Sequence, residues 1–185
     1  IDVKIKNNKY FMISLHPETI NGKNISLSEN LLKSLKKYSQ YIQIFSYPNS
    51  DSESNIILKH IKKYVSQNDN AILHQSYGRI DYLHLLKYSE ILIGNSSSGF
   101  VEAPYLETPT VNVGTRQKGR PTTDSIFNSS YSATSIISNI NLALNYKNSR
   151  KNINYKAMDS VDKVMKILKT IKIDNIKNKS FVDIT

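Results

Sequence analysis

The sequence predicts an α/β fold: a Rossmann-like three-layer domain in which helices cover both faces of a parallel sheet of about six strands. Short apolar segments alternate with segments of helical spacing six times along the chain. The short segments are apolar on both faces, which is typical of parallel strands buried between helices. No repeat or low-complexity linker divides the 185 residues, so we expect a single domain over residues 1–185, with a helical tail from about 146 to 185.

The expected strands are short apolar runs bounded by turn-forming residues. The first follows Asn7-Asn8 and stops before His16-Pro17, and the fourth ends in Gly94. Strands are expected at residues 10–14, 41–45, 71–73, 91–94, 110–113 and 126–127.

The expected helices carry apolar residues at steps of three and four. Pro104 is compatible with a helix because it lies near the start of its segment. The last helix carries Met158, Val161, Met165 and Leu168 on one face, and part of this stripe is expected to be exposed and to favour self-association. Helices are expected at residues 25–38, 56–65, 82–88, 98–105, 133–144 and 155–171.

Composition excludes several classes of protein. There is no run of 18 apolar residues for a transmembrane helix and no signal-peptide core, so no membrane partner is expected. The absence of cysteine excludes disulfides and thiolate metal sites, and it suits a cytoplasmic protein. We expect neither a metal nor a cofactor. Because the chain opens on Ile1-Asp2-Val3, it is expected to be a fragment of a longer protein.

The net charge of +10 raises the alternative of a basic nucleic-acid-binding domain. The positive residues are 21 Lys and only four Arg, and ten of them lie from residue 130 onward, where there are four acidic residues. Such a domain would carry arginines and aromatic residues interleaved on one face. A solvated lysine-rich surface is the favoured interpretation, so no nucleic-acid partner is expected.

The segment from Ile91 to Pro109 predicts an anion site. A buried strand ends at Gly94, and a helix is expected to follow the polar turn. Ligands of open parallel sheets lie beyond the carboxyl ends of the strands, and a helix start offers free N–H groups to a phosphate. The alternative is that one serine simply caps the helix. The residues expected to hold a diphosphate are Asn95, Ser96, Ser97, Ser98 and Gly99.

Charged side chains are expected at the same edge of the sheet. Glu102 lies about one turn into the expected helix, where it can bind two sugar hydroxyls of a ribose or simply favour the helix dipole. Arg116 and Arg120 lie on a glycine-containing loop after the next strand, and their planar guanidinium groups suit phosphate oxygens. The alternative is a loop of solvated charges.

His16 follows the first strand and would face the same edge. A lone histidine is more often structural than functional, so the residue alone indicates little. The other histidines, His60, His74 and His84, show no metal-ligand spacing.

Taken together, these motifs resemble the hydrolysing UDP-N-acetylglucosamine 2-epimerases of sialic-acid and related sugar biosynthesis. The matching stretches are SLHPET at residues 14–19, GNSSSGFVEAP at 94–104 and TPTVNVGTRQKGR at 108–120, in the same order and spacing. The likeness extends over most of residues 10–127.

The resemblance implies the C-terminal half of a glycosyltransferase-B architecture, with a UDP-sugar as substrate. The missing N-terminal domain would supply the carboxylates that move protons, so the isolated chain is expected to be inactive. The full-length protein is expected to be a homo-oligomer. By motif position, Ser96 and Ser97 would hold the diphosphate and Glu102 the ribose hydroxyls. The catalytic residues would be Arg116, which would contact the phosphate or the leaving group, and His16, which would lie close to the diphosphate and the sugar. The uracil would pack on Tyr82 and be recognised by backbone near Tyr77 and Gly78, although Tyr82 by itself could equally be a core residue of its helix.

Two enzyme alternatives share this fold. A non-hydrolysing 2-epimerase would keep UDP on the sugar, although the RQKGR loop at residues 116–120 resembles the hydrolysing branch more closely. A glycosyltransferase of the same architecture would need an acceptor. Some relatives act on a diacetamido sugar nucleotide, and the sequence is compatible with that substrate as well.

Overall fold

The computed structural model describes residues 8–19, 22–146 and 160–171. The chain divides into two units, Ile1–Ile153 and Asn154–Thr185, and each is described by itself. Whether the tail belongs to the same domain as the sheet stays a prediction.

In the described part of the first unit, six parallel strands form one sheet in the order β3-β2-β1-β4-β5-β6. Each strand lies within two residues of its predicted bounds, which confirms the α/β prediction. Because β1 lies between β2 and β4, the strand order reverses at the β1–β4 pair, and ligands of open α/β sheets bind beside such a reversal. The strands are β1 Tyr10–Ser14, β2 Ile42–Ser46, β3 Ala71–His74, β4 Ile91–Gly94, β5 Thr110–Val113 and β6 Ile126–Ser129.

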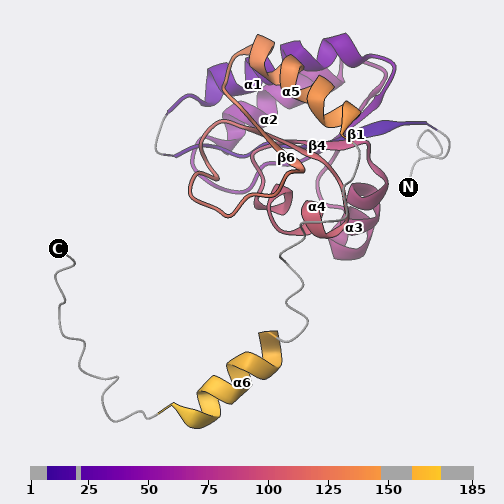
Figure 1. Cartoon of the computed structure of the whole chain (residues 1–185). Helices are drawn as coiled ribbons and strands as arrows, with labels where there is room; N and C mark the ends of the chain where they lie inside the picture. Colours follow the sequence, from indigo (N-terminus) through magenta and orange to yellow (C-terminus); the bar gives the residue numbers. More distant parts are fainter. Residues whose placement is uncertain (1–7, 20–21, 147–159, 172–185) are drawn as a thin grey trace. The chain divides into compact units, whose positions relative to one another are not determined.

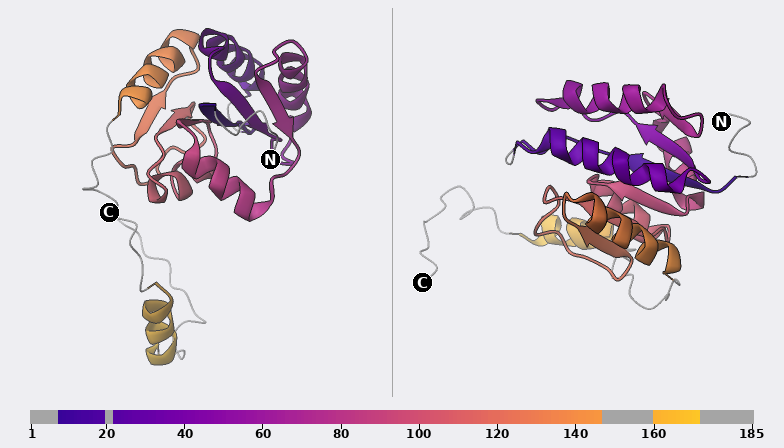
Figure 2. Two further views of the ribbon diagram at one scale, coloured as in Figure 1. Left: turned by 90° about the vertical axis from the view of Figure 1, so that its right-hand side faces the viewer. Right: turned by 90° about the horizontal axis from the view of Figure 1, so that it is seen from above.

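Helices cover both faces of this sheet (Figure 1). One layer holds α1, α2 and α5, with α1 in contact with both of the others (Figure 2), and the other layer holds α3 and α4. The helices are α1 Asn24–Leu35, continued by the 3-10 turn η2 Lys36–Tyr38, then α2 Ser54–Val65, α3 Gly78–Tyr88, the 3-10 turn η3 Ser97–Gly99, α4 Glu102–Tyr105 and α5 Ala133–Asn145; the second unit contains α6 Ser160–Thr170.

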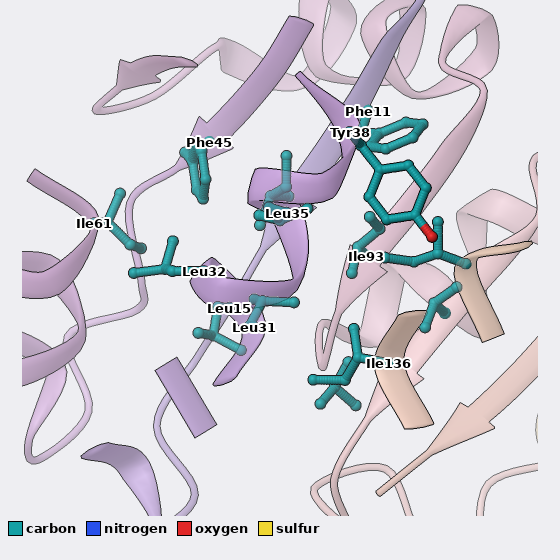
Figure 3. Packing of buried hydrophobic residues seen from close by; sticks show 14 of the residues in the cluster. Phe11, Leu15, Leu31, Leu32, Leu35, Tyr38, Phe45, Ile61, Ile93 and Ile136 are labelled. Carbon is teal, nitrogen blue, oxygen red and sulfur yellow. The ribbon is translucent and has the colours of Figure 1, made fainter. Parts of the chain in front are cut away.

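The core has two parts because strand residues alternate between the faces of the sheet. On β1, Phe11 and Ile13 face the larger cluster, whereas Tyr10 and Met12 face the smaller cluster beneath α3 and α4. Figure 3 shows the larger cluster, in which Leu31 of α1 lies among side chains from the sheet and the neighbouring helices. The buried apolar area on both faces holds the strand ends in place, and the site is built on those ends.

Two predicted helices differ from the structure. The helix predicted at 82–88 begins earlier, at Gly78. The sequence did not indicate its first turn, because that turn is exposed and carries no apolar pattern. The helix predicted at 98–105 is wrong as a continuous element: it is the 3-10 turn η3 followed by the four-residue α4. Pro104 has no N–H to donate to the carbonyl of Phe100, so a continuous helix would lose that bond.

On α6, three residues of the predicted stripe, Val161, Met165 and Leu168, are exposed. Met158 and the predicted helical segment 155–159 lie outside the described residues, and self-association stays a prediction. Among the described residues, no helix has the length and apolar character needed to cross a bilayer.

Candidate functional site

The two central strands approach each other closely where they end. Ser14 pairs with Gly94 in the parallel register, and Gly94 has φ 138°. A Cβ atom added at Gly94 would lie 2.0 Å from the carbonyl oxygen of Ser14, so only glycine fits there. This contact brings the loops after β1 and β4 side by side.

Asn95 joins these two loops through its side chain. The backbone N–H of His16 donates to Asn95 Oδ1 (2.7 Å), and Asn95 Nδ2 donates to the carbonyl of His16 (2.9 Å). The Asn95 side chain is completely buried. Its two polar atoms therefore hold the His16 backbone, and we assign it to building the site and not to contacting a ligand.

The three serines after Asn95 have different surroundings. Ser98 is buried, and its Oγ lies 2.7 Å from the hydroxyl of Tyr82 and 2.9 Å from Ser96 Oγ. Ser96 Oγ also accepts a bond from the backbone N–H of Ser98 (3.3 Å), as a capping residue does. Ser97 is exposed, and Ser96 is partly exposed. Of the three, Ser96 and Ser97 are therefore the residues that a diphosphate could reach.

The serine turn is too short to act as a helix dipole. η3 has three residues and α4 has four, so a bound anion would depend on individual N–H and O–H groups. Gly99 is explained by packing, because a Cβ there would lie 2.6 Å from Thr110 Cγ2 on β5. Glu102 is the first residue of α4 and does not lie one turn into a helix begun by the serines.

A pocket of about 400 Å³ lies between α3 and the start of α4. Glu102 and Tyr82 line it together with Tyr77 and Gly78, so four residues predicted for nucleoside binding come together. The hydroxyl of Tyr77 donates to the carbonyl of Phe45 (3.2 Å). Burial raises the pKa of Tyr77 to about 12 and also raises the pKa of Tyr82, so both phenols stay neutral.

A second pocket, of about 730 Å³, lies beside the loops after β1 and β5. Arg116 and Arg120 line it, as does Lys118. Arg116 Nη1 donates to the carbonyl of Asn95 (3.4 Å), which places the guanidinium next to the serine turn. Both pockets fall within the usual size range of small-molecule sites. The serine turn is bonded to one lining residue of each pocket: Ser98 Oγ to the Tyr82 hydroxyl, and the Asn95 carbonyl to Arg116. The second pocket carries three cations and two carboxylates, Glu18 and Asp51.

His16 is held as a neutral ring. The backbone N–H of Asn49 donates to His16 Nδ1 (3.0 Å), so the ring proton lies on Nε2, which is 3.2 Å from Ser14 Oγ. Burial, and after it the positive charge of Arg116, lowers the pKa of His16 from 6.5 to about 4. At neutral pH His16 therefore carries no charge and has no proton to release as an imidazolium.

Glu18 is a site residue that the sequence did not reveal. Its buried carboxylate accepts bonds from the backbone N–H groups of Thr115 (2.9 Å) and Arg116 (3.1 Å). It also accepts bonds from the hydroxyls of Thr115 (3.1 Å) and Tyr131 (2.6 Å). These partners lie about a hundred residues away in sequence, so no local pattern could have indicated them.

Comparison with known proteins places the chain in a family. Residues 1–169 match the family model described as UDP-N-acetylglucosamine 2-epimerase. The chain belongs to the UDP-N-acetylglucosamine 2-epimerase family. Family membership agrees with the resemblance of the SLHPET, GNSSSGFVEAP and GTRQKGR stretches.

Two curated members of the 2-epimerase family illustrate the likeness. The chain is 37% identical over 131 residues to the GDP/UDP-N,N'-diacetylbacillosamine 2-epimerase (hydrolyzing) of Campylobacter jejuni, covering 70% of this chain and 34% of that protein. It is 33% identical over 183 residues to the polysialic acid biosynthesis protein P7 of Escherichia coli, covering 95% of this chain and 46% of that protein. The chain thus spans between a third and a half of the length of these relatives.

Solved structures of 2-epimerases share the fold. The UDP-GlcNAc 2-epimerase of Methanocaldococcus jannaschii in complex with UDP-GlcNAc and UDP has a TM-score of 0.69 at 18% identity, over 88% of this chain and 45% of that one. The Neisseria meningitidis enzyme bound to UDP-GlcNAc has a TM-score of 0.65 at 17% identity, over 86% of this chain and 45% of that one. At these identities the likeness establishes the fold, which is the glycosyltransferase-B type of half-domain that the sequence predicted.

Proposed function

We propose that this chain is the UDP-binding half of a hydrolysing 2-epimerase, which converts UDP-N-acetylglucosamine or a related diacetamido sugar nucleotide to the free manno-type sugar and UDP. The observation that supports it most is that the turn at residues 95–98 is bonded to a lining residue of each of two pockets. One is lined by Tyr82 and Glu102, the other by Arg116 and Arg120. A nucleoside diphosphate sugar has an aromatic base at one end, which suits the pocket with Tyr82, and charged phosphate groups farther along, which suit the pocket with the arginines.

In this proposal the nucleoside lies in the smaller pocket. Tyr82 packs on the uracil, and the Glu102 carboxylate accepts bonds from the two ribose hydroxyls. The N–H of Gly78 donates to Ser76 Oγ (3.3 Å), so other backbone groups near Tyr77 would recognise the edge of the base. The diphosphate then reaches the hydroxyls of Ser96 and Ser97.

The reaction requires a charged leaving group to be stabilised. The sugar would lose its C2 proton and UDP would depart from C1, which leaves a glycal-like intermediate that adds water. Arg116 would neutralise the departing diphosphate, and a preorganised cation lowers the barrier to such a departure. His16, being neutral, would act by donating a hydrogen bond or by holding the loop, and not as an acid. The groups that move protons would lie on another domain.

Relatives support the hydrolysing reaction over the two alternatives. Both the Campylobacter protein and a Legionella pneumophila relative, 33% identical over 98 residues, are named as hydrolysing 2-epimerases of diacetylbacillosamine nucleotides. A cytoplasmic location, a homo-oligomer and the partnership with a further domain remain predictions of the same proposal.

Calorimetric titration of the chain with UDP tests the binding half of the proposal. We expect the wild-type chain to bind UDP and Glu102→Ala to bind it about tenfold more weakly. With 2′-deoxy-UDP the difference in affinity between the wild type and Glu102→Ala should be smaller, because the carboxylate then has one hydroxyl fewer to bind. Ser97→Ala should weaken UDP binding but leave uridine binding unchanged. Glu29→Ala, which removes an exposed carboxylate on α1 outside both pockets, is the matched control. Absence of UDP binding would contradict the proposal.

Product analysis with the full-length protein tests the reaction. A hydrolysing enzyme releases free sugar and UDP in equal amounts, whereas a non-hydrolysing enzyme returns only the epimeric sugar nucleotide. We expect equal amounts of free manno-type sugar and UDP, and no turnover by residues 1–185 alone. Turnover by the isolated chain would contradict the assignment of the proton-transfer groups to another domain.

A further inference from the structure

The Glu18 carboxylate needs an explanation, because it is a negative charge beside a site proposed to bind a diphosphate. It lines the same pocket as Arg116 and is buried. An anion there would repel phosphate unless its charge were already bound by hydrogen-bond donors. Both carboxylate oxygens accept such bonds: Oε1 from two backbone N–H groups, and Oε2 from two hydroxyls.

Glu18 is itself fixed from the other side. Its backbone N–H donates to Asn24 Oδ1 (2.7 Å), and Asn24 Nδ2 donates to the carbonyl of Glu18 (3.3 Å). Asn24 is buried at the start of α1. The Glu18 backbone is therefore held by the first residue of α1, and the carboxylate extends from this fixed point.

The loop after β5 is shaped to receive this carboxylate. Gly114 has φ 85°, and a Cβ there would lie 2.3 Å from Glu18 Oε1 and 2.8 Å from Tyr131 Cε1. Any side chain at Gly114 would displace the carboxylate from the two N–H groups that follow it. The bonds fix the Thr115–Arg116 backbone, from which the Arg116 side chain extends to the serine turn.

We propose that Glu18 is a positioning residue, which holds the Arg116 backbone so that the guanidinium stays at the diphosphate. This inference rests on the proposed function. Charge-assisted bonds from a buried carboxylate to backbone N–H groups are strong and directional, so the loop is ordered before any ligand binds. The anion site therefore gains affinity from a negative charge that never touches the anion.

A double-mutant cycle separates positioning from a general structural role. UDP affinity is measured by calorimetry for the wild-type chain, Glu18→Ala, Arg116→Ala and the double variant. We expect Glu18→Ala to weaken UDP binding by about tenfold in the wild-type background and by less than about twofold in the Arg116→Ala background, because the carboxylate acts through Arg116. Equal weakening in both backgrounds would overturn the proposal.

Two further variants act as controls. Glu18→Gln should weaken binding by only about threefold, because the hydroxyls of Thr115 and Tyr131 can turn to accept bonds from the amide. Tyr131→Phe removes one bond to Oε2 but leaves both bonds to Oε1, so UDP affinity should stay within about twofold of the wild type. A Tyr131→Phe loss as large as that of Glu18→Ala would overturn the proposal.

The test remains decisive if Glu18→Ala does not fold. Glu18→Asp keeps the charge but shortens its reach, so its loss of affinity should again depend on the presence of Arg116. If the wild-type chain binds UDP and no Glu18 variant alters the affinity, the positioning role fails and the proposed function stands. If the wild-type chain does not bind UDP, the proposed function itself fails.

Discussion

Arg116 forms an ion pair with Asp51: Arg116 Nη2 lies 3.6 Å from Asp51 Oδ2. Asp51 belongs to the loop after β2 and also accepts a bond from Asn49 Nδ2 (3.2 Å). The cation proposed to receive a diphosphate is thus already beside a carboxylate, which the incoming anion would have to replace.

The first prediction is that Asp51→Asn raises the affinity for UDP. The pair is partly exposed, and such pairs contribute up to about 1 kcal/mol, so we expect a gain of about two- to fivefold. The gain should shrink at high salt, because screening weakens the competing charge. Calorimetric titration at two salt concentrations measures both effects. A loss of affinity would instead mean that Asp51 holds Arg116 in its binding position.

The second prediction concerns pH and His16. Its pKa falls from 6.5 in the unfolded chain to about 4 in the folded chain, so only the unfolded chain takes up a proton between these values. The stability from the neutral ring is fully present above pH 6.5 and is lost as the pH falls toward 4, by up to about 3 kcal/mol. Denaturant unfolding of the wild type and His16→Gln should show a difference that shrinks over this window. Parallel curves for the wild type and His16→Gln would refute the assignment.

The third prediction is that Gly94→Ala destabilises the sheet by about 3 kcal/mol or more, because the new Cβ meets the Ser14 carbonyl and φ is positive. Gly119→Ala is the matched control. Gly119 also has positive φ, but its Cβ would meet nothing within 4 Å, so only backbone strain of about 1 to 2 kcal/mol is expected. Denaturant unfolding measures both variants, and equal losses would contradict the close approach of β1 and β4.

The fourth prediction separates the ring of Tyr82 from its hydroxyl. Tyr82→Phe removes the bond to Ser98 Oγ and should cost about 1 kcal/mol of stability, with UDP affinity within about twofold of the wild type. Tyr82→Leu removes the ring that would pack on uracil and should weaken UDP binding by about three- to tenfold. Thermal unfolding and calorimetry measure the two effects. A Tyr82→Phe affinity as low as that of Tyr82→Leu would show that the hydroxyl, and not the ring, carries the contact.

The sequence predicted the fold well because its signals are local. Apolar runs such as Tyr10–Ser14 and the helical spacing of Leu27, Leu31 and Leu35 indicate their elements without knowledge of their neighbours. It failed at the first turn of α3, which is exposed and has no apolar pattern, and at the break before α4, where Pro104 has no N–H for a continuous helix.

The sequence by itself determined the parallel α/β sheet, the family, and the segments that end at one edge of that sheet, because the alternation of strands and helices and the spacing of the motifs are features of the linear chain. Only the tertiary structure decided which of these residues can meet a ligand. It buried Asn95 and Ser98, neutralised His16, and joined Glu18 to Arg116. The physical reason is that hydrogen bonds and desolvation depend on distances between segments that lie 16 to 98 residues apart in these examples, and folding alone sets those distances.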